Sequence, residues 1–125
     1  MRDYLTKPDV IAIHDDQLLR FGGAAGIRDE GALEAALARP QNGYYADLLE
    51  EAAALWESVS QNHAFIDGNK RTAFASLDVF LTINGARLTA SPDEVIDFVY
   101  RLYETNAFLY KNLLPWLRER VDVTA

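Results

Sequence analysis

Residues 72–83 have the sequence TAFASLDVFLTI, in which apolar side chains point to almost every side of a predicted helix. A helix of this kind is usually central in its fold, with neighbours on several sides. Its start is expected near Asn69, and Gly85 follows Asn84 as a natural stop, because glycine readily adopts the backbone conformation that ends helices. The sequence therefore predicts a buried central helix at about residues 69–84.

Capping and stop signals predict further helices on both sides of this one. They are expected at about residues 8–21, 30–39, 47–62, 92–103 and from 112 onward. The strongest start is Ser91-Pro92-Asp93-Glu94, which combines a capping serine with a glutamate three positions later. Asn112 is expected to cap the last helix, with Pro115 in its first turn. We predict an all-α fold, a compact single domain over residues 1–125 with about six helices, and a loop or short hairpin at 40–46.

The charge balance and composition exclude several classes of function. The chain has 12 Lys and Arg against 19 Asp and Glu, a formal net charge of −7. Direct binding to a nucleic-acid backbone is not expected, because it requires clustered cations that neutralise many phosphates. No apolar run reaches the ~18 residues that cross a bilayer, and the start Met1-Arg2-Asp3-Tyr4 does not resemble a secretion signal. The default expectation is a cytoplasmic protein without membrane contact.

The segment at residues 63–71, HAFIDGNKR, lies between two predicted helices and concentrates chemically useful side chains. An imidazole such as that of His63 can accept a proton from a hydroxyl near neutral pH. Asp67 offers a hard oxygen ligand suited to Mg²⁺ that bridges phosphates, and it could also simply cap the next helix. Phe65 is expected to anchor the loop in the core, and Gly68 allows close approach of a ligand to the backbone.

Lys70 and Arg71 stand where a helix is already electropositive. The first N–H groups of a helix lack intrahelical partners and carry a partial positive charge, so anions bind there readily. Two cations at this position are unfavourable unless an anion is bound, which indicates a phosphate site. The alternative is that both side chains form an ordinary solvated face.

The pattern His63-x-Phe65-x-Asp67-Gly68-Asn69-Lys70-Arg71 resembles the signature of the Fic family in its Doc (death-on-curing) form. The glycine-rich stretch at residues 22–34, GGAAGIRDEGALE, and the following Arg39-Pro40-Gln41 are also similar to Doc-type sequences. The layout agrees from about residue 8 to 121. The nine-residue pattern is highly specific, and the glycine stretch is supporting evidence.

The resemblance implies a compact helical fold that transfers part of ATP to a protein hydroxyl. It makes His63 the general base and Asp67 the Mg²⁺ ligand. It assigns phosphate contacts to the start of the central helix, through Gly68, Asn69, Lys70 and Arg71. It also implies a flap that holds the target protein, formed by Gln41, Asn42, Gly43, Tyr44 and Tyr45. From the residues alone, the two tyrosines could equally be aromatics of the core or its rim.

Three departures from the commoner Fic pattern concern the reaction. Ala64 replaces a proline, Lys70 replaces a second glycine, and Phe74 stands in place of a second arginine. Doc-like proteins share these departures and are protein kinases that phosphorylate a threonine of elongation factor Tu, which stops translation. They are restrained by a separate antitoxin chain, whose segment lies along a groove of the toxin. The alternatives are an AMP-transferring enzyme with the same site, or a non-catalytic binding module with the same fold.

Several residues outside the pattern are given structural interpretations. His14 is expected to be a structural or surface residue, because no motif surrounds it. The glycines at 22, 23 and 26 are expected to form turns. A solvated helix face is expected for three acidic residues, Glu50, Glu51 and Glu57.

Overall fold

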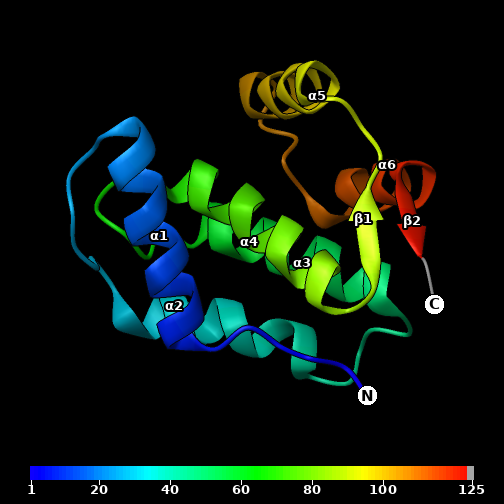
Figure 1. Ribbon diagram of the computed structural model, residues 1–125, viewed down its shortest axis with the longest axis horizontal. Helices are drawn as coiled ribbons and strands as arrows, with labels where there is room; N and C mark the ends of the chain where they lie inside the picture. Colours follow the sequence, from blue (N-terminus) through cyan, green and yellow to red (C-terminus); the bar gives the residue numbers. More distant parts are fainter. Residues whose placement is uncertain (124–125) are drawn as a thin grey trace.

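Six α-helices carry most of the chain between residues 1 and 123, the part that the computed structural model describes. They are α1 (Lys7–Phe21), α2 (Glu30–Ala38), α3 (Leu48–Gln61), α4 (Asn69–Ile83), α5 (Pro92–Glu104) and α6 (Tyr110–Arg120) (Figure 1). A 3-10 turn, η1 (Arg39–Gln41), follows α2 directly. Two short strands, β1 (Ala86–Leu88) and β2 (Val121–Val123), complete the elements. The predicted all-α fold is confirmed.

The core is built on α3 and α4, which lie side by side (Figure 1). Trp56 of α3 is fully buried, and four aromatic rings surround it at centroid distances of 5.4–6.2 Å. They belong to Phe74, Phe98, Phe108 and Trp116. Because these residues come from α4, α5, α6 and the segment before α6, one indole ties the C-terminal half of the chain to α3.

Local caps fix most of the helix starts, as the sequence predicts. The side chains of Asp29 and Asp47 accept the Ala32 and Glu50 amides at the starts of α2 and α3. Ser91 and Glu94 form a capping box at α5. The starts of these helices therefore follow from residues within one turn of each other.

The start of α6 differs from the prediction. The helix begins at Tyr110 rather than at Asn112, and Pro115 lies inside it. The reason is a cap from another helix, because Glu57 Oε2 of α3 accepts the Tyr110 amide at 2.7 Å. Asn112 is otherwise engaged: its side-chain amide donates to the Ala107 carbonyl at 2.9 Å.

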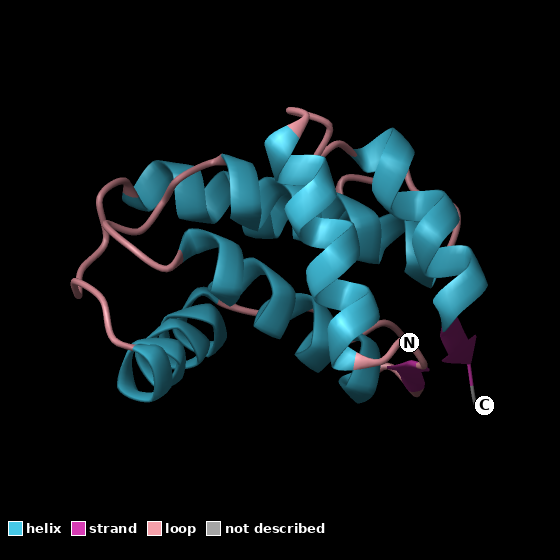
Figure 2. Ribbon diagram, turned by 90° about the horizontal axis from the view of Figure 1, so that it is seen from above, coloured by secondary structure: helices cyan, strands magenta, loops and turns pink. Residues whose placement is uncertain are grey.

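Residues 40–46 form a 3-10 turn and an irregular loop rather than the short hairpin that the sequence left open. Pro40 is buried within the turn and has no amide N–H to donate to a strand ladder. Arg39 Nε donates to the hydroxyl of Tyr45 at 2.9 Å, which folds the loop back onto its own start. Strand pairing occurs elsewhere: β1 and β2 are antiparallel, with Arg87 opposite Asp122, near both termini (Figure 2).

The acidic residues of α3 do not form the expected solvated face. Glu51 is buried and pairs with Arg2 at 3.0 Å, and Glu57 is mostly buried and pairs with Arg39 at 2.5 Å. Glu50 lies nearer the surface, where it meets Arg118 at 3.3 Å. The basic partners come from distant parts of the chain, so the spacing along α3 could not reveal them. Between residues 1 and 123, no helix has the length and apolar character that a membrane span requires.

Candidate active site

The loop between α3 and α4 is held in one shape by its own side chains and backbone. His63 has a left-handed backbone with φ of 50°, and Gly68 has φ of 76° at the start of α4. Asn69 closes the loop, because its side-chain amide accepts the Phe65 N–H at 3.0 Å and donates to the Phe65 carbonyl at 2.9 Å. His63 is exposed by this turn and does not continue the buried face of α3.

Phe65 and His14 join the loop to the core. The ring of Phe65 is 1% exposed and stacks on the imidazole of His14, with centroids 3.8 Å apart and planes inclined by 8°. His14 lies on α1 and is itself buried. Its Nε2 stands 2.8 Å from the main-chain carbonyl oxygen of Asp67. A histidine outside the motif thus contacts the loop at two points.

The glycine-rich segment before α2 pairs with the same loop. Ile27 and Phe65 form an antiparallel bridge, in which the Ile66 amide donates to the Gly26 carbonyl at 3.0 Å. The Arg28 amide donates to the Ala64 carbonyl at 2.7 Å. The three glycines at 22, 23 and 26 all have positive φ, and Gly26 permits this close approach, since a Cβ on it would meet Ile66 at 2.9 Å.

Asp67 presents an oriented and ionised carboxylate. Its Oδ2 accepts the Ala24 amide at 3.2 Å and its Oδ1 accepts the Gly68 amide at 2.8 Å. These two backbone donors, helped by the charge of Arg71, hold the pKa of the Asp67 carboxyl below its usual range. The side chain is exposed, so both oxygens can still meet a ligand.

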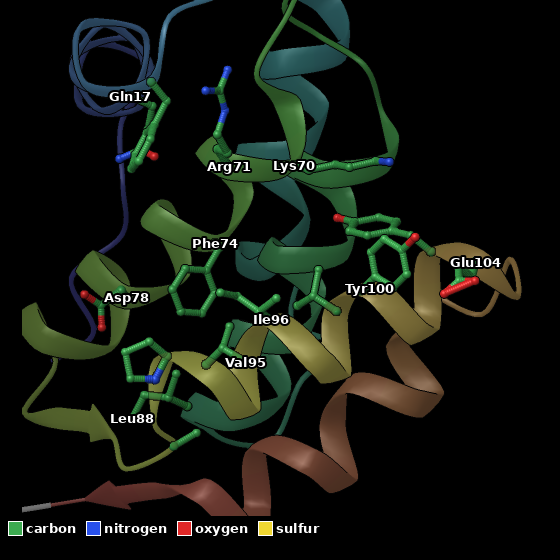
Figure 3. Close-up of a pocket in the computed structure, with 15 residues that line it drawn as sticks. Gln17, Lys70, Arg71, Phe74, Asp78, Leu88, Val95, Ile96, Tyr100 and Glu104 are labelled. Carbon is green, nitrogen blue, oxygen red and sulfur yellow. The ribbon is translucent and has the colours of Figure 1, made fainter.

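The two cations at the start of α4 have protein partners. The Lys70 ammonium lies 4.3 Å from the ring centroid of Tyr103 on α5. Arg71 donates to the Gly22 carbonyl at 3.0 Å and lies over the ring of Phe21. Figure 3 shows the two side chains extending in different directions from α4. The main-chain N–H groups in the first turn of α4 therefore remain available to donate hydrogen bonds to a bound anion.

One cavity of about 390 Å³ brings the predicted catalytic and phosphate-binding residues together. It is lined by His63, Ile66, Asp67, Gly68, Asn69, Lys70 and Arg71. The flap residues 41–45 are not part of this lining among the described residues. A proton acceptor, a carboxylate and a helix N-terminus thus share one opening, which is the set of groups that phosphoryl or nucleotidyl transfer needs.

The residues at this cavity fit Mg²⁺ only together with a phosphate ligand. Within residues 1–123, no three His, Asp or Glu side chains come together as a metal site. Asp67 alone supplies an ionised oxygen ligand, and Mg²⁺ is commonly held by one or two carboxylates plus substrate phosphates.

Comparison with known proteins agrees with this geometry. The model of the Fic/DOC family matches residues 4–81, which include the whole cavity lining. The chain belongs to the Fic/DOC family. It is 45% identical over 98 residues to a protein named Toxin Doc from Mycolicibacterium smegmatis, covering 74% of this chain and 73% of that protein. It is 35% identical over 94 residues to Protein kinase doc of Escherichia phage P1, covering 72% and 75%.

This Fic/DOC chain has a second, larger cavity beside the first. It measures about 880 Å³ and lies between α4 and α5, with Gln17 of α1 at one end (Figure 3). Most of its lining is apolar, including Phe74, Val95, Ile96 and Val99. We call this larger cavity the groove. Lys70 and Arg71 line both cavities, so the groove and the smaller cavity adjoin at the start of α4.

Sequence reasoning missed three contributors to the site of this Fic/DOC protein. Ile66 lines the cavity, the Ala24 amide orients the Asp67 carboxylate, and His14 holds its main chain. The cluster of glycines at 22–26 was the one available signal for Ala24, because such a cluster permits close backbone approach. For His14 the sequence offers no comparable signal.

Proposed function

We propose that this Fic/DOC chain is a Doc-type toxin kinase. It would transfer the γ-phosphate of ATP to a threonine or serine hydroxyl of a translation factor resembling elongation factor Tu, and so arrest growth. The observation that carries the proposal is the shared cavity of His63, Asp67 and the start of α4. The name Protein kinase doc of the relative from phage P1 supports the choice of reaction.

The main chain supplies the phosphate cradle in this proposal. The first N–H groups of α4 lack partners within the helix, and Gly68 precedes them with φ of 76°. A polyphosphate here would sit at the positive end of the helix dipole. Lys70 and Arg71 line the same cavity and would add charge by leaving Tyr103 and the Gly22 carbonyl.

His63 is the proton acceptor of the proposed step. It takes the proton of the target hydroxyl as that oxygen forms a bond to the γ-phosphorus. The bond between the γ-phosphorus and the β–γ bridging oxygen breaks, and ADP leaves with that oxygen. Asp67 would hold Mg²⁺, which when bound neutralises charge on the phosphate oxygens. The protein mainly positions and stabilises the reacting groups.

Two side chains support transfer of the terminal phosphate over transfer of AMP. Lys70 stands where the commoner Fic pattern has glycine, so a side chain is present at the helix start where that pattern has none. Phe74 stands where that pattern has a second arginine, and it faces the apolar groove instead (Figure 3). Loss of an arginine removes a bidentate phosphate clamp.

Labelled ATP distinguishes the two reactions. Purified protein, Mg²⁺ and a lysate would be incubated with ATP labelled at either the γ- or the α-phosphate. Label from the γ-position on a protein band, with a mass gain of one phosphate, is the expected result. Label from the α-position, with a gain of AMP, would refute the kinase. His63→Ala is the control and should lower the rate about 10²–10⁴-fold, the usual contribution of a general base.

The apolar groove between α4 and α5 is the proposed seat of an antitoxin chain. The relative from Mycolicibacterium smegmatis is named Toxin Doc. The resemblance to Doc-type sequences implies a separate antitoxin chain that restrains such a toxin. An amphipathic segment fits the groove, because its floor is apolar and charged groups such as Lys70, Asp78 and Glu104 border it (Figure 3). Its occupant would cover Lys70 and Arg71 and thereby obstruct the phosphate site.

Selection for restored growth tests this partner. Genomic fragments from the source organism would be screened for those that relieve growth arrest by the toxin. Ile96→Asp places a charge in the groove and should abolish relief while arrest persists. Leu19→Asp is the matched control, since Leu19 is 86% exposed on α1 and outside the groove lining among the described residues. Relief that survives Ile96→Asp would place the antitoxin elsewhere.

A further inference from the structure

His14 is a polar side chain in a place that an apolar ring would fill. It is 2% exposed on α1, and its imidazole stacks face to face on Phe65. A phenylalanine would make the same stack without a polar nitrogen to satisfy. Burying a polar group is unfavourable unless it finds a hydrogen-bond partner. The partner of the His14 ring is therefore the feature that needs an explanation.

That partner is the main chain of the candidate metal ligand. His14 Nε2 lies 2.8 Å from the carbonyl oxygen of Asp67. A carbonyl oxygen can only accept, so Nε2 carries the proton and donates it. The bond reaches the peptide group between Asp67 and Gly68. A Cβ on Gly68 would stand 3.7 Å from His14 Nε2, which shows how closely the ring covers this peptide.

This peptide controls both halves of the phosphate site. On one side it carries the Asp67 carboxylate, and on the other it leads into Gly68, whose φ of 76° starts α4. Rotation of the peptide would turn the carboxylate away from the Ala24 amide, which it accepts at 3.2 Å. It would also tilt the first N–H groups of α4.

We infer that His14 is a positioning residue for the metal and phosphate site, acting through the Asp67–Gly68 peptide; this rests on the proposed phosphotransfer function. The imidazole is buried and lies outside the lining of the smaller cavity among the described residues, so it acts on the site through the peptide. It fixes the peptide by its Nε2–H donor, and the stack on Phe65 fixes the ring. Partners that orient the ligands of a metal site typically contribute about 10–100-fold to metal affinity or activity.

Two substitutions separate the donor from the ring. His14→Phe keeps an aromatic ring against Phe65 and removes Nε2–H. His14→Gln brings a side-chain amide N–H near the same position and should restore part of the effect. Val10→Ala is the matched control for packing, because Val10 is fully buried one turn earlier on α1. Thermal unfolding of all three variants shows how much packing each has lost.

Two readouts follow, and the first needs no nucleotide. In ligand-free protein, hydrogen exchange of the Gly68 amide should be about tenfold faster in His14→Phe than in Val10→Ala. Calorimetric affinity for Mg·ATP should fall about 10–100-fold in His14→Phe, recover in part in His14→Gln and stay near wild type in Val10→Ala. The turnover rate at saturating Mg·ATP should change less than KM, because His63 is untouched.

The inference is overturned if His14→Phe leaves both the Gly68 exchange rate and the Mg·ATP affinity at wild-type values. It is equally overturned if Val10→Ala lowers them as much. Wild-type protein that does not bind Mg·ATP would instead refute the proposed function, and the exchange rates would still decide the role of His14. Should His14→Phe fail to fold, NMR of the wild type decides: a slowly exchanging His14 Nε2–H proton is expected, and a proton on Nδ1 alone would refute the inference.

Discussion

A Cβ on Gly23 would stand 2.8 Å from Oδ2 of Asp67, closer than a carbon atom can approach that oxygen. The glycine-rich segment before α2 and the loop before α4 are 44 residues apart in sequence at this contact. They are packed so tightly that the carboxylate fills the space of a missing side chain. Gly23 also has φ of 121°, a backbone conformation that side chains rarely adopt. The orientation of Asp67 therefore depends on the absence of a side chain at residue 23.

Gly23→Ala should damage the site beyond its effect on stability. The added methyl group displaces the Asp67 carboxylate, so calorimetric affinity for Mg·ATP should fall at least tenfold. The matched control is Gly43→Ala, because Gly43 has φ of 87° and nothing within 4 Å of its added Cβ. Backbone strain should lower the free energy of unfolding by about 1–3 kcal/mol in each variant. Equal Mg·ATP affinities in the two variants would contradict the packing argument.

The Asp67 carboxyl should titrate at lower pH than an ordinary aspartate. The Ala24 and Gly68 amides stabilise its charged form and hold its pKa below the usual range. Its contribution to stability is thus fully present above the pKa of an unfolded aspartate and is lost as the pH falls through the lower folded pKa. The carbon-13 shift of the Asp67 carboxyl, followed by NMR against pH, gives the midpoint. A midpoint at the ordinary aspartate value would show that the two amide bonds are not made in solution.

The helices could be predicted from the sequence because their caps are local. Ser91 and Glu94 lie within one turn and form the predicted capping box. The chemical groups at the site could also be located, because they lie in nine consecutive residues from His63 to Arg71. Consecutive residues in a tight loop remain neighbours whatever the rest of the chain does. Features were therefore predictable where the residues that determine them lie close together in the sequence.

Contacts between distant segments could not be predicted. The start of α6 at Tyr110 depends on Glu57, and the shape of the Asp67 peptide depends on His14, each 53 residues away. A glutamate on a helix is usually solvated, and a lone histidine is usually structural, so the ordinary expectation concealed both roles. The two buried or half-buried ion pairs of α3 were hidden for the same reason, because their basic partners lie far along the chain.

Glu57→Gln should destabilise the fold although the residue lies outside the site. Its Oε1 accepts Arg39 Nη1 at 2.5 Å and its Oε2 caps α6 through the Tyr110 amide at 2.7 Å. Glutamine keeps one acceptor oxygen and loses the charge, so one partner is left poorly satisfied. Chemical denaturation should show a loss of about 1–3 kcal/mol in the free energy of unfolding. Glu34→Gln is the control, because Glu34 pairs with Lys7 on the surface, and its effect should be clearly smaller.

Tyr103 of α5 lines the groove and contacts α3, and the contributions of its hydroxyl and its ring to stability should be separable. The hydroxyl lies 2.5 Å from Ser60 Oγ, while the ring stacks on Phe108 and carries the Lys70 ammonium. Tyr103→Phe keeps the ring and leaves the buried Ser60 hydroxyl unpaired. We expect a loss of about 1–3 kcal/mol in the free energy of unfolding. Adding Ser60→Ala to that variant removes the unpaired hydroxyl and should recover part of the loss, and additive effects would contradict the hydrogen bond.

The same tyrosine should make the wild type lose stability at alkaline pH. Burial raises the pKa of Tyr103 to about 12, from an ordinary value of 10.0. A raised pKa means that the unfolded state releases its proton first. The contribution of Tyr103 to stability is therefore complete below about pH 10 and is lost progressively as the pH rises toward about 12. Denaturation at a series of pH values gives the free energy of unfolding as a function of pH. Between about pH 10 and 12 it should fall more steeply for the wild type than for Tyr103→Phe. An equal fall in the two proteins would show that the tyrosine is not buried in solution.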